Sequence, residues 1–166
     1  MSLEVTVNAG ARGVLRNTTS VAGNEADPVG ANDSDTETTL VSMPTQFFTV
    51  APCRVVDTRG GAEVPVGGPA LAARSARTFA LAGHCGIPST AQAVALNVTV
   101  TQPGAPGNLR LFPAGLNLPL VSSVNYAAGQ TRASNVVVAL DASGGIAAYA
   151  DQASGTTVHI IVDVSG

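Results

Sequence analysis

The amino-acid sequence predicts an all-β protein whose larger part is an antiparallel two-sheet β-sandwich of about eight strands. From residue 47 onward, short apolar stretches recur roughly every 10 to 15 residues, and Gly, Pro and Asn separate them. No segment of the 166 residues shows helical periodicity. Because eight strands fit the two Greek keys of a jelly roll, we favour that connectivity over an Ig-like strand order or a closed barrel.

The first 41 residues contain three short β-type stretches, residues 4–7, 14–21 and 36–41. Between the last two stretches, residues 22–35 are crowded with Gly, Asn, Asp and Pro and predict a long turn-rich connection. Three strands are too few to bury both faces of a sandwich. We therefore expect a partial β segment over residues 1–41, a linker over residues 42–46, and a separate domain over residues 47–166.

Period-two alternation between turns defines the strands expected in the domain. The clearest alternation covers residues 93–101, where one face carries Val94, Leu96, Val98 and Val100. Residues 60–69 are rich in Gly and Pro and predict an irregular excursion. The expected strands cover residues 47–59, with an interruption at Pro52, and residues 76–81, 93–101, 109–112, 122–126, 133–141, 146–151 and 157–164.

Two of these strands carry further expectations about burial. In residues 133–141, the position of Val137 opposite the inward face predicts that this strand is buried on both sides, and residues 141–145 predict a hairpin to the next strand. The inward side chains are expected to be Val136, Val138 and Leu140 in that strand, and Val158, Ile160, Val162 and Val164 in the last one.

The composition is poor in charge. Only 11% of the residues are charged, against about 25% in a typical domain, and lysine does not occur. The surface must then consist mostly of small and uncharged polar residues, which suits an extracellular β protein. A net charge of -3 with eight scattered arginines gives no basic stripe, so we expect no nucleic-acid partner. No apolar run approaches the roughly 18 residues of a membrane span, so none is expected.

The chain has two cysteines, Cys53 and Cys85, each next to a turn-forming Pro or Gly. Their spacing fits one structural disulfide, with two free buried thiols as the alternative, and it fits zinc poorly because no second Cys or His pair lies at ligand spacing. A disulfide closing this loop would contribute about 3 to 4 kcal/mol. It implies an oxidising compartment, and we expect an extracellular or cell-surface location.

The partial segment resembles a known repeat. Its Asn17-Thr-Thr-Ser-Val21, Asp27-Pro28 and Ala31-Asn-Asp-Ser34 sequences, followed by the Thr-rich stretch ending at Val41, are similar to the C-terminal half of the Ig-like conserved repeat domain of bacterial surface proteins. The resemblance implies a truncated Ig-like segment with an open sheet edge. We expect either the following domain or a second copy of the chain, in a homodimer, to cover that edge.

Six short sequences spread over residues 47–166 carry a second resemblance. They are Pro52-Cys-Arg-Val-Val-Asp-Thr-Arg59, Cys85-Gly-Ile-Pro88, Ala95-Leu-Asn-Val-Thr-Val-Thr101, Asn125-Tyr126, Gly129-Gln-Thr-Arg132 and His159-Ile-Ile-Val-Asp-Val164. Together they resemble a family of secreted domains found in high-GC bacteria. The resemblance implies a noncatalytic module that is joined to other domains of a larger secreted or surface polypeptide, with no known ligand and no cofactor. Members typically end in Gly-Tyr-Phe, so it also implies that Gly166 lies at the domain end.

Arg54, Asp57 and Arg59 are three charges within eight residues of a chain that is otherwise poor in charge. They form a candidate site for an acidic sugar or another carboxylate. The alternative, which we favour, is a structural ion pair between Asp57 and Arg59 that organises the irregular residues after the strand. His159 and Asp163 are about 13 Å apart along a strand and have no nucleophile elbow near them, so we expect no catalytic triad and no enzyme.

Asp33, Asp35 and Glu37 place carboxylates at alternate positions and form a weak candidate for calcium. They lack the glycine and the terminal bidentate glutamate of an EF-hand loop, so a solvated turn is favoured. Three Asn-x-Ser/Thr triplets begin at Asn17, Asn32 and Asn97. They are glycosylation acceptors only in an organism that modifies such sites.

Two function classes are left open by the residues. The first is a structural or adhesive surface module, and the second is a carbohydrate-binding module that uses a glycan as partner, by analogy with other jelly rolls. Sugar sites normally contain exposed aromatic rings, and this chain has no Trp and only two Tyr, Tyr126 and Tyr149. These two tyrosines are the candidate ligand platform, and their scarcity favours the structural module.

Overall fold

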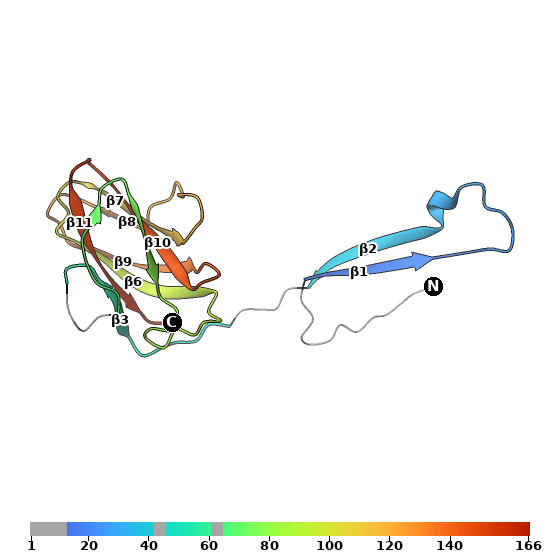
Figure 1. Ribbon diagram of the computed structural model, residues 1–166, viewed down its shortest axis with the longest axis horizontal. Coiled ribbons are helices and arrows are strands. Elements are labelled where there is room, and N and C mark those ends of the chain that lie inside the picture. The colour runs from blue at the N-terminus through green and yellow to red at the C-terminus, as the bar shows by residue number, and fades with distance from the viewer. Residues whose placement is uncertain (1–12, 42–45, 61–64) are drawn as a thin grey trace. The chain divides into compact units, whose positions relative to one another are not determined.

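The computed structural model describes residues 13–41, 46–60 and 65–166. They belong to two compact units, Met1–Gln46 and Phe47–Gly166, each of which we describe by itself (Figure 1). The strand expected at residues 4–7 and most of the expected linker lie outside the described residues. The described residues form strands and no α-helix, and they include no helix that is long and apolar enough to cross a membrane. The predicted all-β class is confirmed.

The first unit contains a two-stranded antiparallel ribbon. Strand β1 (Gly13–Ser20) pairs with β2 (Ser34–Val41) over the full length of both strands. The connection between them includes one short 3-10 turn, η1 (Gly30–Asn32). Every side chain of β1 is exposed, and so is every side chain of β2 except Val41. Within residues 13–41 the ribbon therefore buries neither of its faces.

The second unit contains the eight expected strands and one additional short strand. The additional strand, β4, pairs with the last strand of the chain. The strands are β3 (Cys53–Asp57), β4 (Leu71–Ala72), β5 (Ala76–Ala80), β6 (Ala93–Thr101), β7 (Gly107–Pro113), β8 (Val124–Tyr126), β9 (Arg132–Ala139), β10 (Gly145–Gln152) and β11 (Thr157–Val164).

These strands form two sheets with the connectivity of a jelly roll. One sheet has the order β3-β11-β6-β9, with β4 also on β11, and the other has the order β5-β10-β7-β8. Leaving β4 aside, the first strand pairs with the last, the second with the last but one, and so on inward to β7 with β8. All of these pairs are antiparallel. This nested pairing is a long hairpin rolled into a sandwich, so the favoured connectivity is confirmed.

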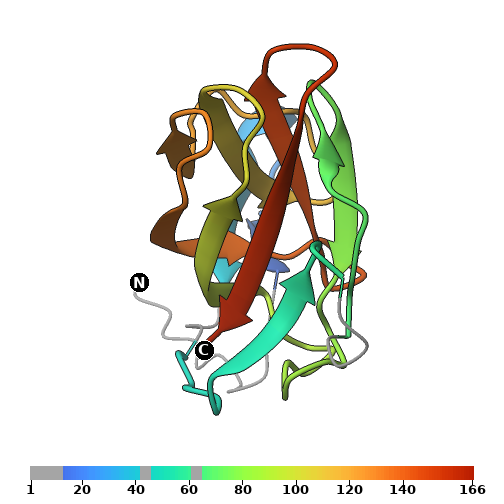
Figure 2. The same cartoon turned by 90° about the vertical axis from the view of Figure 1, so that its left-hand side faces the viewer.

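The core lies between the two sheets, where their inner faces meet. The expected inward residues of β11 are confirmed, because none of the four exposes more than 1% of its surface. Figure 2 shows β11 beside β3, the strand with which the rolled hairpin begins. The largest fully buried side chains include Phe79, Leu71, Leu81, Leu96, Leu109, Ile146 and Ile160.

The segment before β3 differs from the expectation. Residues 47–52 form no strand, although residues 47–59 were expected to be extended as one strand or a pair. Val50 donates one backbone hydrogen bond to Ser165, and Phe47 and Phe48 are both exposed. Pro52 lies directly before β3. Because proline has no backbone N–H, it would interrupt the hydrogen-bond ladder if it stood inside the strand. The regular strand therefore starts only at Cys53.

The hairpin predicted at residues 141–145 is also wrong. The turn itself is tight, since Gly144 donates to the carbonyl of Asp141 and Asp141 donates to that of Gly145. However, β9 pairs with β6, whereas β10 pairs with β5 and β7 in the other sheet. The turn therefore carries the chain from one sheet to the other, a distinction that turn residues alone do not make.

The two-sided burial predicted for residues 133–141 is wrong as well. Val138 is buried, and Val136 and Leu140 pack against the core as expected, but Val137 is 76% exposed. Strand β9 is the edge of its sheet, and no described element covers its outer face at Val137.

Candidate functional site

A β-bulge in the pairing of β3 with β11 brings the charged side chains of β3 onto one face. Residues 54 and 57 are an odd number of positions apart, which in a regular strand would place them on opposite faces. The register shifts between Val162 and Asp163, and Val55 and Val56 are both fully buried. Arg54 consequently lies opposite Asp163, and Asp57 lies opposite Ile161, on the outer face of the sheet.

On this face, each arginine is paired with an aspartate, and the pairs are connected to each other. Arg59 donates two side-chain hydrogen bonds to Asp57, at 2.9 Å and 2.6 Å, and its backbone N–H donates a third at 3.1 Å. Arg54 donates to both carboxylate oxygens of Asp163, at 2.9 Å and 3.4 Å, and lies 3.6 Å from Asp57. Two arginines and two aspartates therefore neutralise one another. We call these four residues the β3 charge network.

Asp57 is the buried member of this network. It exposes only 6% of its surface, whereas the side chains of both arginines are more than 40% exposed. The hydrogen bonds from Arg59 lower the pKa of Asp57, against the opposing effect of burial. The carboxylate is therefore ionised at neutral pH, and both of its oxygens have hydrogen-bond donors.

We expect the charge of Asp57 to make stability depend on pH in the acidic range. Because its pKa is lower in the folded state, its contribution is present above the unfolded pKa of about 3.9 and is lost as the pH falls through the folded value. Urea unfolding between pH 7 and pH 2 should show constant stability down to about pH 4 and a decline below it. The decline should be smaller in Asp57→Asn, and equal declines in both proteins would contradict this assignment.

Thr58 joins the same strand end to β11. Its hydroxyl accepts the N–H of Ile160 at 2.8 Å and lies 3.1 Å from Nδ1 of His159. The residue is 1% exposed. His159 therefore contacts Thr58, whereas Asp163, four residues along β11, pairs with Arg54.

Cys53 and Cys85 form the expected disulfide, with their Cα atoms 5.7 Å apart. The bond ties the first residue of β3 to the turn between β5 and β6. Cys85 has a positive φ of 52° in that turn, where Ile87 donates to the carbonyl of His84. The β3 charge network is thus carried on a strand that is fixed at its start by the disulfide and along its length by β11.

Of the two candidate tyrosines, only Tyr149 reaches the surface. Tyr126 is 6% exposed, and its hydroxyl donates to Oε1 of Gln152 at 2.9 Å. Burial, with a further contribution from the charge of Asp151, raises the pKa of Tyr126 to about 12. The prediction of a ligand platform at Tyr126 is wrong, because the inward position of this residue in β8 makes the ring part of the core.

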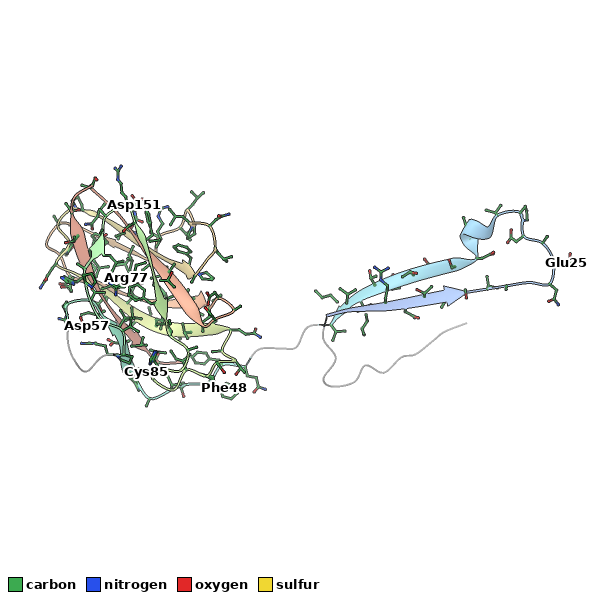
Figure 3. All side chains as sticks on the ribbon, in the orientation of Figure 1. Glu25, Phe48, Asp57, Arg77, Cys85 and Asp151 are labelled. Carbon is green, nitrogen blue, oxygen red and sulfur yellow. A yellow bond between two sulfur atoms is a disulfide. The ribbon has the colours of Figure 1, made fainter. Side chains whose placement is uncertain are left out.

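Tyr149 lies on the outer face of β10 beside a cluster that the sequence reasoning missed. The guanidinium of Arg110 lies 5.9 Å from the centre of the Tyr149 ring, and it also contacts Asp151, Asn108 and the carbonyl of Pro119. Asp151 lies at the opposite end of the sandwich from Cys85 (Figure 3). The sequence held one signal of this cluster. Asn108 and Arg110 are alternate residues of one strand, Tyr149 and Asp151 are alternate residues of another, and the two strands pair.

The structure does not bring Asp33, Asp35 and Glu37 together as a group that could hold a metal ion. Asp35 and Glu37 are alternate residues of the extended strand β2, about 7 Å apart along the chain, and the Asp35 carboxylate accepts the N–H of Thr36. In the described parts of the chain, no group of three His, Cys, Asp or Glu side chains is placed to hold a metal ion. Among the Asn-x-Ser/Thr triplets, Asn97 lies within β6 and donates to Asn135 at 3.0 Å.

A shallow, open hollow lies between β8 and β9, the two strands at one side of the sandwich. Small and polar side chains line most of it, among them Ser123, Asn125, Gln130, Arg132 and Ser134. Neither the β3 charge network nor Tyr149 contributes to this hollow.

No protein-family model matches the chain, and no curated protein sequence matches it either.

Proposed function

We propose that this chain is a noncatalytic extracellular module with a structural or adhesive role in a larger secreted or cell-surface bacterial protein. The observation that supports this proposal most directly is the closure of the β3 charge network. Both carboxylate oxygens of Asp57 accept hydrogen bonds from Arg59, and the two arginines oppose two aspartates. The charges that looked most like a binding site in the sequence serve the fold.

The disulfide and the surface composition support the extracellular setting. A disulfide between Cys53 and Cys85 persists in oxidising compartments and is rare in reducing ones. The other domains of the same polypeptide are the proposed partners. The homodimer expected through residues 4–41 and the assignment of these residues to an Ig-like repeat stay predictions.

A carbohydrate-binding module is the second candidate, and one observation favours it. Tyr149 is partly exposed on the outer face of the sheet, and the next row of that face places Asp151, Asn108 and Asn125 side by side. An aromatic ring beside planar polar side chains is the usual chemistry for recognising a sugar ring and its hydroxyl groups. One observation disfavours this candidate. Arg110 donates hydrogen bonds to both Asp151 and Asn108, so these acceptors are already used within the protein.

A glycan array probed with the full chain separates the two candidates. The structural module predicts no glycan bound above background, by either the parent or Tyr149→Ala. Micromolar binding by the parent that Tyr149→Ala abolishes would contradict the proposal and establish the second candidate. Leu120→Ser is the matched control, because Leu120 is an exposed apolar residue outside this row. Circular dichroism should confirm that both variants keep the parent fold.

A further inference from the structure

Among the described residues of the second unit, no strand pairs with the outer edge of β9. Leu140, just after the strand, donates its backbone N–H to Gln92 on the β6 side. In an antiparallel ladder, successive residues direct their backbone groups alternately toward the two neighbours. The N–H and C=O groups of Asn135, Val137 and Ala139 therefore point away from β6. The side chains of the same three residues are all exposed.

The other three sheet edges differ from this one. The edge of β3 is covered, because Val66 exchanges backbone hydrogen bonds with Val55 and Asp57. Strand β8 is only three residues long. Strand β5 has five residues, and the side chain of its second residue, Arg77, reaches the carbonyls of residues 67–69. Strand β9, with eight residues, is the longest edge strand in the described part of the sandwich.

Strand β9 also lacks the features that usually protect an edge. Its sequence contains no proline and no lysine, its one charge is Arg132 at the first position, and its register with β6 is unbroken by a bulge. Proline, lysine and bulges are the common devices that prevent an edge strand from pairing with another chain. Val137, a residue with strong strand propensity, instead stands 76% exposed in the middle of the open stretch.

We propose that β9 pairs antiparallel with β9 of a second copy of this chain, about a two-fold axis that passes midway between the two Val137 residues. In this register Val137 faces Val137 of the other copy, and Asn135 faces Ala139. Each of the three outward-pointing residues then donates one backbone hydrogen bond and accepts one. The β9-containing sheets of the two copies then form one continuous sheet, and their outer faces lie on the same side of it.

A second copy fits this edge because the edge is self-complementary. The two-fold axis brings the two exposed Val137 side chains together, which removes apolar surface from water in both copies. No charged residue lies in the paired stretch of residues 135–139, so no like charges oppose each other. Arg132 lies beyond the paired stretch. Because the contact is short, we expect a weak dimer well below the size of a standard interface.

Cysteine cross-linking of the full chain tests both the contact and its register. Residues opposite each other in a hydrogen-bonded antiparallel pair have Cα atoms about 5.5 Å apart, within disulfide range. Val137→Cys should therefore form a covalent dimer under mild oxidation. Ala139→Cys is the matched control, because in this register the two copies of residue 139 are about 13 Å apart. Absence of the Val137→Cys dimer, or equal dimer yields from both variants, would overturn the proposal.

Sedimentation of the variants gives an independent readout. The parent should show a monomer–dimer equilibrium between about 10 µM and 1 mM, the range of weak interfaces. Val137→Lys should be monomeric over this range, because it places two like charges across the axis. Leu120→Lys should dimerise like the parent, since it removes an even more exposed apolar side chain elsewhere. A monomeric parent, an unaffected Val137→Lys, or loss of the dimer in Leu120→Lys would each contradict pairing through β9. These results do not depend on the proposed function.

Discussion

Removing the disulfide, with Cys53→Ser and Cys85→Ser together, is expected to lower the free energy of unfolding by about 3 to 4 kcal/mol. The bond joins residues at a sequence separation of 32. Its loss returns conformational entropy to the unfolded chain, and it also releases the first residue of β3 from the turn after β5. For a unit of this size the cost corresponds to a fall in Tm of roughly 10 to 20 °C.

Differential scanning calorimetry with and without reductant measures this effect. Reductant should bring the Tm of the parent to that of the double variant and should leave the double variant unchanged. Replacing both cysteines avoids a free thiol that could cross-link two chains. A parent protein whose Tm does not respond to complete reduction would show that the disulfide does not anchor β3.

Replacing Asp57 with asparagine is expected to destabilise the folded state by about 1 to 2 kcal/mol without affecting any binding. The substitution keeps the size of the side chain but removes the charge that Arg59 and Arg54 face. Because Asp57 is 6% exposed, water does not readily replace the lost interactions. Urea unfolding at pH 7 measures the change.

Asp163→Asn is the matched control for this substitution. Asp163 lies on the same face and also pairs with Arg54, but its side chain is 35% exposed. Exposed ion pairs contribute at most about 1 kcal/mol, so this variant should be less destabilised than Asp57→Asn. The opposite order would mean that Asp57 is not the centre of the β3 charge network.

The strand pattern of the sandwich could be predicted from the sequence because alternation and burial coincide there. Strands β6 and β11 are central in their sheet and carry one strictly apolar face, which the period-two pattern reveals directly. Turn residues supplied the breaks between strands. They did not reveal that the turn at residues 141–145 connects two different sheets, because that depends on pairing partners distant in the sequence.

The geometry of the β3 charge network could be predicted only in part. The pairing of Asp57 with Arg59 could be expected from their spacing of two residues, although Arg59 lies in the turn after β3 and not in the strand. The approach of Arg54 to the same face depends on the bulge opposite Val162, which is a property of two strands together. The one local sign of it is the pair of consecutive valines between the two charges, which a regular strand would place on opposite faces.

Exposure at the sheet margins was the least predictable property. Tyr126 and Val137 both lie in strands at one side of the sandwich, yet the first is buried and the second is exposed. Their burial depends on whether each side chain points toward the facing sheet, which the register of β8 and β9 determines. A single residue's polarity carries no information about that direction.

The most direct test of the anchor role of β3 is a double-mutant cycle between Asp57→Asn and Arg59→Gln, measured by urea unfolding at pH 7. If the two side chains stabilise the fold through each other, the double variant should lose less than the sum of the single losses. We expect a coupling energy of about 1 kcal/mol or more. Single variants as stable as the parent, with effects that add to within about 0.5 kcal/mol, would contradict the structural account of this strand.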